Sequence, residues 1–283
     1  MSGKPALRKS QTDARASAFG DGAAGDRPSD DRSVAARLFA IVDAFTTPTA
    51  AASLTLTAIA ERAGLPLSTT HRLVTEWVTW GGLTRQDDGR YALGLRLWEV
   101  GVQTPTARNL RTIALPYLED LFEVSREHVH LAILDGHDAL YLEKLSGHSP
   151  VRIISRVGGR LPLHSTGVGL VLLAYAPTDV IQAYLGASLQ RFLPQTVTSP
   201  DELRRRLAGI RAQGIALMSE EMTAGSSSIA APIRDRTGHV VAAVSTVTRT
   251  TAPAAPIDPT QELAVRVAAQ GISRALGYRR ASS

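Results

Sequence analysis

One segment of the chain carries side chains that are well suited to reading a nucleic acid. Directly after a Gly-Leu-Pro tripeptide come a leucine, three hydroxyl residues, a histidine and an arginine: Leu67, Ser68, Thr69, Thr70, His71 and Arg72. Hydroxyls donate and accept hydrogen bonds, and arginine binds a phosphate or the major-groove edge of guanine. A hydroxyl run of this kind also serves simply to cap a helix, so its role depends on the elements around it.

The flanking residues predict that this segment opens the second helix of a helix-turn-helix. Apolar residues recur at helical spacing over residues 34–45, which predicts a first helix. Thr57 is expected to cap a short helix over residues 58–63, and a further helix is expected over residues 67–80. A helix-turn-helix exposes the start of its second helix to base edges in the major groove. The segment that begins at Leu67 is therefore the predicted recognition helix.

A β-hairpin is expected next. Two short apolar-polar stretches, residues 83–86 and 90–93, flank an Asp-Asp-Gly turn. Arg85 lies in this hairpin, Arg90 lies at its tip side, and Thr57 lies at a helix N-terminus, so these three are candidate phosphate contacts. Three helices followed by a hairpin are the layout of a winged helix-turn-helix.

Composition limits the other classes of function. The net charge is +5, yet residues 34–94 carry five basic and five acidic side chains, so charge alone does not locate a DNA-binding segment. The absence of cysteine excludes disulfides and thiolate metal sites. Residues 1–30 lack the apolar core of a signal peptide, and no apolar stretch approaches the ~20 residues of a membrane span. A cytoplasmic location is expected.

The predicted fold is a two-domain arrangement, mostly α with a β-hairpin wing at the N-terminus and α+β beyond it. Strand and helix patterns alternate in the larger C-terminal part, which is typical of an α+β ligand-binding domain. The expected parts are a disordered tail (1–32), the winged helix-turn-helix DNA-binding domain (33–94), a linker helix (95–108), the effector-binding domain (109–278) and a short tail (279–283).

Residues 163–169, Leu-His-Ser-Thr-Gly-Val-Gly, carry the chemistry of an anion site. Backbone N–H groups at the start of a helix attract anions, and glycines let a ligand approach the backbone. Hydroxyls at residues 226–228 and at Ser245 can add donors. A carboxylate ligand suits this set, although serines that cap turns and glycines that allow tight packing give the same pattern.

The chain resembles the IclR-type bacterial regulators. SVAARLFAIVDAF, LTLTAIAERAGLPLSTTHRLV and GRYALGLRLWEVG are similar to the DNA-binding domain of that family. HVHLAILDGHDALYLEKL, PVRIISRVGGRLPLHSTGVG, GIALMSEEMTAG and IAAPIRDRTGHVVAAVS are similar to its effector-binding domain. The resemblance runs from Ser33 to Gly277, and the order and spacing of the motifs make it specific.

This resemblance implies a regulator, more often a repressor than an activator, of genes for the catabolism of small organic compounds. It implies that the effector-binding domain is GAF-like and that the chain forms homodimers or homotetramers. The implied partners are double-stranded operator DNA and a small-molecule effector. It implies no enzyme activity and no cofactor. At Leu67 the chain departs from many members, which carry a basic residue there, so the operator sequence is not transferred.

The resemblance also implies an effector site. Its members use backbone amides at two positions and side chains at four, which correspond here to Gly167, Val168, Met218, Ser228, Ser245 and Val247. Several acid-sensing members have aspartate, cysteine and serine where this chain has Met218, Ser228 and Val247. Because two polar groups are replaced by apolar ones, we expect an effector that is larger and more apolar than a two- or three-carbon oxoacid, such as an aromatic acid.

Two other functions are weighed against this reading. A hydrolase would use His164, Ser165 and Glu220 or Glu221, but neighbours in an extended segment point to opposite faces, and no Gly-x-Ser-x-Gly elbow is present. A metal sensor would use the histidines that gather in one region, but their spacing matches no known ligand pattern. These are His128, His130, His137, His148 and His164.

Overall fold

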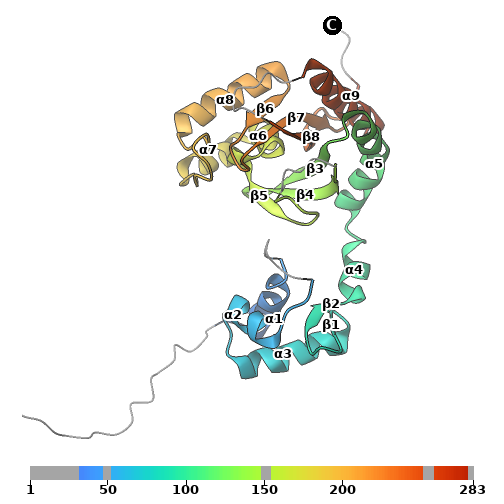
Figure 1. Cartoon of the computed structure of the whole chain (residues 1–283), viewed down its shortest axis with the longest axis vertical. Coiled ribbons are helices and arrows are strands. Elements are labelled where there is room, and N and C mark those ends of the chain that lie inside the picture. The colour runs from blue at the N-terminus through green and yellow to red at the C-terminus, as the bar shows by residue number, and fades with distance from the viewer. Residues whose placement is uncertain (1–31, 47–51, 148–153, 251–257, 280–283) are drawn as a thin grey trace, which may run out of the picture.

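The computed structural model describes residues 32–46, 52–147, 154–250 and 258–279. It has a small N-terminal helical domain and a larger α+β domain, with α4 (Leu95–Gly101) between them (Figure 1). The predicted tails fall outside the described residues except at Arg32 and Arg279. Arg32 donates hydrogen bonds to the carbonyls of Ala63 (3.0 Å) and Gly64 (2.7 Å), so it belongs with the helical domain rather than with the tail to which it was assigned.

The N-terminal domain is a winged helix-turn-helix, as predicted. Its elements are α1 (Val34–Asp43), α2 (Leu56–Ala63), α3 (Leu67–Trp80), β1 (Leu83–Arg85) and β2 (Tyr91–Leu93). The core combines apolar side chains of all three helices with Leu83 and Tyr91 from the hairpin. Leu54 adds a short bridge to Tyr91, so the wing is paired on its second edge.

Thr55, and not Thr57, caps α2. The Thr55 hydroxyl accepts a hydrogen bond from the N–H of Ala58 at 3.2 Å, which satisfies one free donor of the first turn. Thr57 is therefore an exposed residue within the first turn of the helix. Gly64 ends α2 with φ 62°, a left-handed conformation that favours glycine.

The long helix after the linker begins earlier than expected. α5 (Pro105–Ser125) starts at Pro105, whereas the predicted linker helix covers residues 95–108 and the effector-binding domain was expected to begin at residue 109. Proline lacks only an N–H that the first turn leaves unpaired, so it starts a helix as readily as it ends one. The four residues that close the predicted linker helix therefore belong to α5.

The C-terminal domain is built on a six-stranded sheet with strand order β5-β4-β3-β8-β7-β6, and all of its neighbouring strands are antiparallel. The strands are β3 (His128–Asp135), β4 (Asp138–Leu145), β5 (Arg160–Pro162), β6 (Ala216–Ser219), β7 (Ser226–Arg234) and β8 (Val240–Arg249). The edge strand β6 is absent from the sequence prediction. Its four residues are too few to show a clear alternation of apolar and polar side chains.

Helices cover both faces of this sheet (Figure 1). One core lies under α6 (Gly167–Ala174), α7 (Thr178–Gly186) and α8 (Pro200–Gln213), and the other lies under α5 and α9 (Pro259–Ala275). Every residue of α6 is buried, so this apolar helix is held in the domain interior. The sequence prediction omits α7, which follows Pro177. In the described parts of the chain, no helix is both long and apolar enough to cross a membrane.

Candidate functional site

The start of α3 presents only part of the predicted DNA-reading set to solvent. Ser68, His71 and Arg72 are exposed, and Leu67 is 52% exposed. Thr70 is fully buried, and its hydroxyl donates to the carbonyl of Pro66 at 3.0 Å. Thr70 therefore stabilises the first turn and is removed from the candidate DNA-contacting set.

Thr69, the remaining member of this set, is half-buried. It lies beside the exposed residues in the first turn of α3, where successive side chains point about 100° apart. Its hydroxyl stays a candidate contact at the border of the exposed face.

The two wing arginines have different surroundings. Arg85 is exposed on β1. Arg90 is half-buried, and its guanidinium donates to the hydroxyl (3.1 Å) and the carbonyl (3.0 Å) of Ser53. These bonds tie the hairpin to the segment before α2. Arg90 therefore holds the wing in place. The sequence had suggested instead that it lies at the tip side of the hairpin, as a candidate phosphate contact.

All six predicted effector residues line one cavity of the C-terminal domain. Ten further residues complete its wall: His130, Tyr141, Ile154, Ser155, Leu161, Ser165, Thr166, Met222, Thr223 and Ser226. The cavity lies between the start of α6 and the face of the sheet that packs against this helix.

The start of α6 supplies the polar end of this cavity. Thr166 caps the helix by accepting from the N–H of Gly169 at 3.2 Å, while Gly167 and Val168 open the helix, where N–H groups have no intrahelical acceptor. The hydroxyls of Ser165 and Ser228 are buried, with no hydrogen-bond partner among the described residues. A buried hydroxyl without a partner costs about 1–3 kcal/mol, so a ligand that accepts from these groups gains binding energy.

Gly167 leaves room at this point. A Cβ atom there would lie 2.5 Å from the Ser228 hydroxyl oxygen, which is closer than packed atoms approach. Only glycine keeps the Ser228 hydroxyl and the helix N-terminus open to the same ligand. The sequence prediction places both residues in the site but does not show that they lie side by side.

The opposite wall contains a buried histidine that the sequence prediction did not assign to the site. His130 is 2% exposed, and its Nε2 lies 2.7 Å from the hydroxyl oxygen of Ser155. Burial, together with the smaller effect of the charges of Lys144 and His128, lowers the pKa of His130 to about 3. Its ring meets the ring of Tyr141 edge to face, with centroids 5.3 Å apart. His130 is buried because β3 is covered on both faces, and the pairing of β3 with β8 brings it opposite Ser245.

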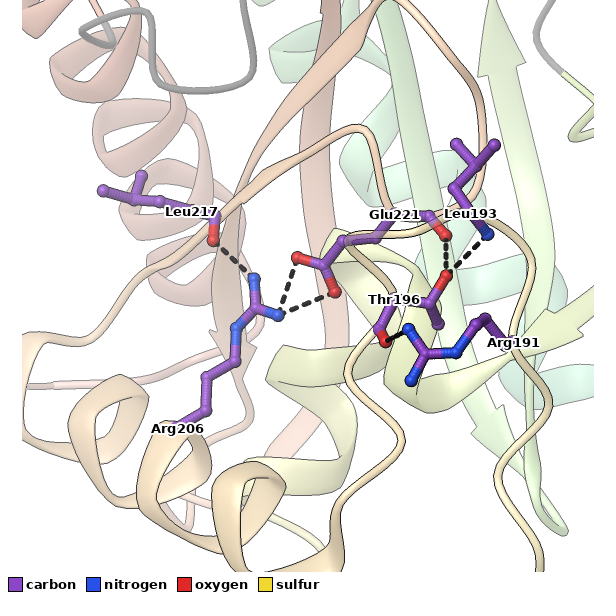
Figure 2. Close-up of polar contacts among 6 residues, drawn as sticks. All are labelled: Arg191, Leu193, Thr196, Arg206, Leu217 and Glu221. Carbon is purple, nitrogen blue, oxygen red and sulfur yellow. Dashed lines mark hydrogen bonds and ion pairs between the residues drawn. The ribbon is translucent and has the colours of Figure 1, made fainter.

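A buried ion pair supports the segment that carries Met222 and Thr223 (Figure 2). Arg206 on α8 contacts both carboxylate oxygens of Glu221 at 2.7 and 2.8 Å and donates to the carbonyl of Leu217 at 2.8 Å. Burial raises the pKa of Glu221, and the guanidinium of Arg206 opposes that rise. This pair fixes one wall of the cavity from outside it.

The contacts of His164 argue against a hydrolytic site. Its Nδ1 lies 2.7 Å from the Tyr184 hydroxyl and its Nε2 lies 2.9 Å from the carbonyl of Gln190. Both ring nitrogens are therefore engaged away from Ser165, and Glu221 is engaged by Arg206. Among the described residues, which exclude His148, no three histidine or acidic side chains gather closely enough to hold a metal ion.

A winged helix-turn-helix joined to a domain with a cavity at a helix N-terminus is the architecture of a ligand-responsive DNA-binding regulator. The chain belongs to the IclR family of bacterial transcriptional regulators and is not an enzyme. Residues 34–87 match the IclR helix-turn-helix domain, and residues 102–274 match the bacterial transcriptional regulator IclR C-terminal domain.

Curated relatives and solved structures agree with this assignment. The regulator XynR of Escherichia coli is 35% identical over 81% of this chain and 91% of its own length, and the E. coli repressor IclR is 34% identical over 68% and 72%. An IclR homolog of Microbacterium hydrocarbonoxydans, solved with 4-hydroxybenzoate, is 39% identical, with a TM-score of 0.79 over 86% of this chain and 99% of that one. Thermotoga maritima IclR has 30% identity and a TM-score of 0.67 over 86% and 98%.

Proposed function

We propose that this regulator is a repressor of catabolic genes that responds to an aromatic carboxylic acid. The observation that carries the proposal is the cavity at the start of α6, in which N–H and hydroxyl groups at one end face apolar side chains. The Microbacterium hydrocarbonoxydans relative was solved with 4-hydroxybenzoate, an acid of this kind. Operator binding would take place in the cytoplasm.

The apolar residues of the cavity favour a ring over a small oxoacid. Met218 and Val247 lie in the wall together with Leu161 and Met222. A two- or three-carbon oxoacid would place polar atoms against these apolar side chains, or would leave the side chains in contact with water. An aromatic ring buries its apolar faces against them, which contributes about 25 cal/mol for each Å² removed from water.

Calorimetry of the purified chain tests this proposal. We expect benzoate and 4-hydroxybenzoate to bind more tightly than glyoxylate and pyruvate. Met218→Asp is expected to weaken benzoate binding at least tenfold, because it replaces an apolar contact of the ring by a carboxylate that would lose its water when the ring binds. The matched change Leu217→Asp, at a 38% exposed position on the same strand, should leave the affinity nearly unchanged. Tight binding of only the small oxoacids would contradict the proposal.

For operator binding, we infer that the exposed face of α3 enters the major groove. Ser68, His71 and Arg72, with Leu67 and Thr69 beside them, form the candidate base-reading set. Arg85 on the wing and Thr57 in the first turn of α2 are candidate phosphate contacts, and Arg90 acts through its hold on the wing. The exposure of Ser68, His71 and Arg72 supports the inference, because a side chain that reads a base must be accessible to the DNA.

Arg72→Ala should weaken binding to duplexes from the promoter region beside the protein's own gene. Loss of an arginine contact to a guanine edge costs about 1–3 kcal/mol, which is about 5- to 150-fold in affinity. Fluorescence anisotropy at several salt concentrations measures this change. Arg205→Ala removes an exposed arginine of α8 and serves as the matched control. Equal affinities of the two variants would exclude Arg72 from the interface.

We also infer a homodimer formed through the linker region. Large apolar side chains are exposed at the end of α3, on β2 and on α4: Trp80, Leu93, Leu95, Trp98 and Val100. Apolar surface of this extent favours a partner, and a symmetric dimer would place two recognition helices on two operator half-sites. Tetramers would need further contacts between effector-binding domains. Analytical ultracentrifugation tests the dimer, and a monomer at micromolar concentration would exclude it.

A further inference from the structure

The cavity contains a second polar site, at His130, in addition to the polar start of α6. His130 lies on β3 directly opposite Ser245 of β8, while Ser228 lies on β7, on the other side of β8. Neighbouring strands are spaced about 4.8 Å apart, so His130 and Ser228 are separated by roughly 10 Å of sheet. Val247, next to Ser228 on β8, lines the cavity between these strands. A ring bound by its carboxylate at α6 therefore has its far edge nearest His130.

The contacts of His130 leave hydrogen-bonding capacity for a ligand. Its Nε2 is bonded to the Ser155 hydroxyl, and no hydrogen bond joins Nδ1 to any described residue. If the serine donates, Nδ1 carries a proton and donates, and the serine oxygen can accept. If Nε2 donates, Nδ1 accepts and the serine hydroxyl can donate. In either tautomer the pair offers both a donor and an acceptor, which matches a hydroxyl group.

The wall of the cavity offers no charged partner to an anion at this place. None of its described lining residues is a lysine or an arginine. Lys144 lies opposite His130 on β4, but its amino group donates to the carbonyl of Ser155 at 2.8 Å and does not line the cavity. A neutral imidazole with these neighbours cannot form an ion pair, so a second carboxylate would lose its water without gaining a charged partner.

We propose that His130 and Ser155 form a specificity site for a neutral hydroxyl group on the effector ring, remote from its carboxylate. This inference rests on the proposed aromatic-acid function and narrows it. The effector class is a hydroxylated aromatic monoacid, as distinct from an unsubstituted aromatic acid or an aromatic diacid.

Calorimetry with benzoate, 4-hydroxybenzoate and benzene-1,4-dicarboxylate tests the inference. We expect the parent chain to bind 4-hydroxybenzoate about tenfold more tightly than benzoate, as one buried hydrogen bond allows, and to bind the diacid most weakly. Ser155→Ala and His130→Leu should reduce the preference for 4-hydroxybenzoate to nearly onefold while the affinity for benzoate stays within about threefold. His130→Asn, which keeps an amide near the position of Nδ1, should restore part of the preference.

Thr248→Val is the matched control, because it removes a hydroxyl of β8 that bonds Ser227 and does not line the cavity. It should leave the preference for 4-hydroxybenzoate unchanged. Equal affinities of the parent chain for benzoate and 4-hydroxybenzoate, or equal losses for both acids in Ser155→Ala, would overturn the specificity site alone. Failure of the parent chain to bind either acid would overturn the aromatic-acid function on which this inference rests.

Discussion

Gly167→Ala is expected to weaken effector binding by about 10- to 150-fold and to leave the fold intact. The new Cβ would lie 2.5 Å from the Ser228 hydroxyl oxygen. Rotation of the serine relieves this contact at small cost, so the domain still folds, but the hydroxyl then leaves the ligand. A hydrogen bond to a charged group contributes about 1.5–3 kcal/mol, and 1.4 kcal/mol is a factor of ten in affinity.

Calorimetry with 4-hydroxybenzoate measures this loss, and thermal unfolding confirms that the variant is folded. Gly209→Ala on α8 is the matched control, because a Cβ there meets no atom within 4 Å. It replaces glycine by a better helix former at a site away from the cavity and should bind the acid as the parent does. Unchanged affinity in Gly167→Ala would show that the ligand does not approach the start of α6.

Arg206→Met is expected to destabilise the effector-binding domain by about 3 kcal/mol, because it leaves the Glu221 carboxylate buried without its partner. The Glu221 side chain is 6% exposed and that of Arg206 is 22% exposed, which places the effect at the lower end of the range for buried pairs. Glu221→Gln keeps hydrogen-bonding groups and removes the charge, so its effect should be much smaller. The double variant should recover most of the loss.

The pH dependence of this variant has a definite sign. Burial already raises the pKa of Glu221, and loss of Arg206 removes the main opposing influence. A carboxyl group with a raised pKa in the folded state stabilises the fold below its unfolded pKa of ~4.3, and this stabilisation is lost as the pH rises through the folded pKa. The difference between Arg206→Met and the parent should therefore be largest at neutral pH and shrink toward pH ~4.

Urea unfolding followed by two signals separates the domains. All three tryptophans, Trp77, Trp80 and Trp98, lie in the N-terminal domain and α4, so their fluorescence reports that part of the chain. We expect its midpoint to stay unchanged while the circular dichroism midpoint of the effector-binding domain falls. Arg205→Met, at the neighbouring exposed position, is the control. Equal stability of the two variants would mean that the ion pair does not support the domain.

Short-range patterns in the sequence determine the ends of several elements. Pro66 and Gly81 bound α3 as predicted, and Gly81 ends it with φ 83°. Ser199 caps α8 by accepting from the N–H of Glu202, and Gly214 ends that helix with φ 70°. Helix ends of this kind can be identified in a sequence because each depends on a few consecutive residues: a side chain that bonds a free N–H, or a glycine in a left-handed conformation.

Tertiary packing determines which candidate side chains are available. Thr70 belongs to a hydroxyl run that looks uniform in the sequence, yet the packing of α3 on the domain core buries it. Arg90 is held by Ser53, 37 residues earlier in the chain, in a contact that no local pattern specifies. The prediction that Thr57 caps α2 was wrong, because Thr55, two residues earlier, carries an equally suitable hydroxyl and lies where the helix actually starts.

The resemblance in the sequence identified six cavity residues on four separate elements, and the fold brings all six into one cavity wall. It did not identify Ser165, whose unpaired hydroxyl becomes evident only when its surroundings are known. Nor did it identify the pair of His130 and Ser155, which lie 25 residues apart. Residue types and local spacing determine the kind of chemistry that the chain carries. Burial, strand order and long-range hydrogen bonds determine which groups remain free to perform it, because these depend on packing across the whole domain.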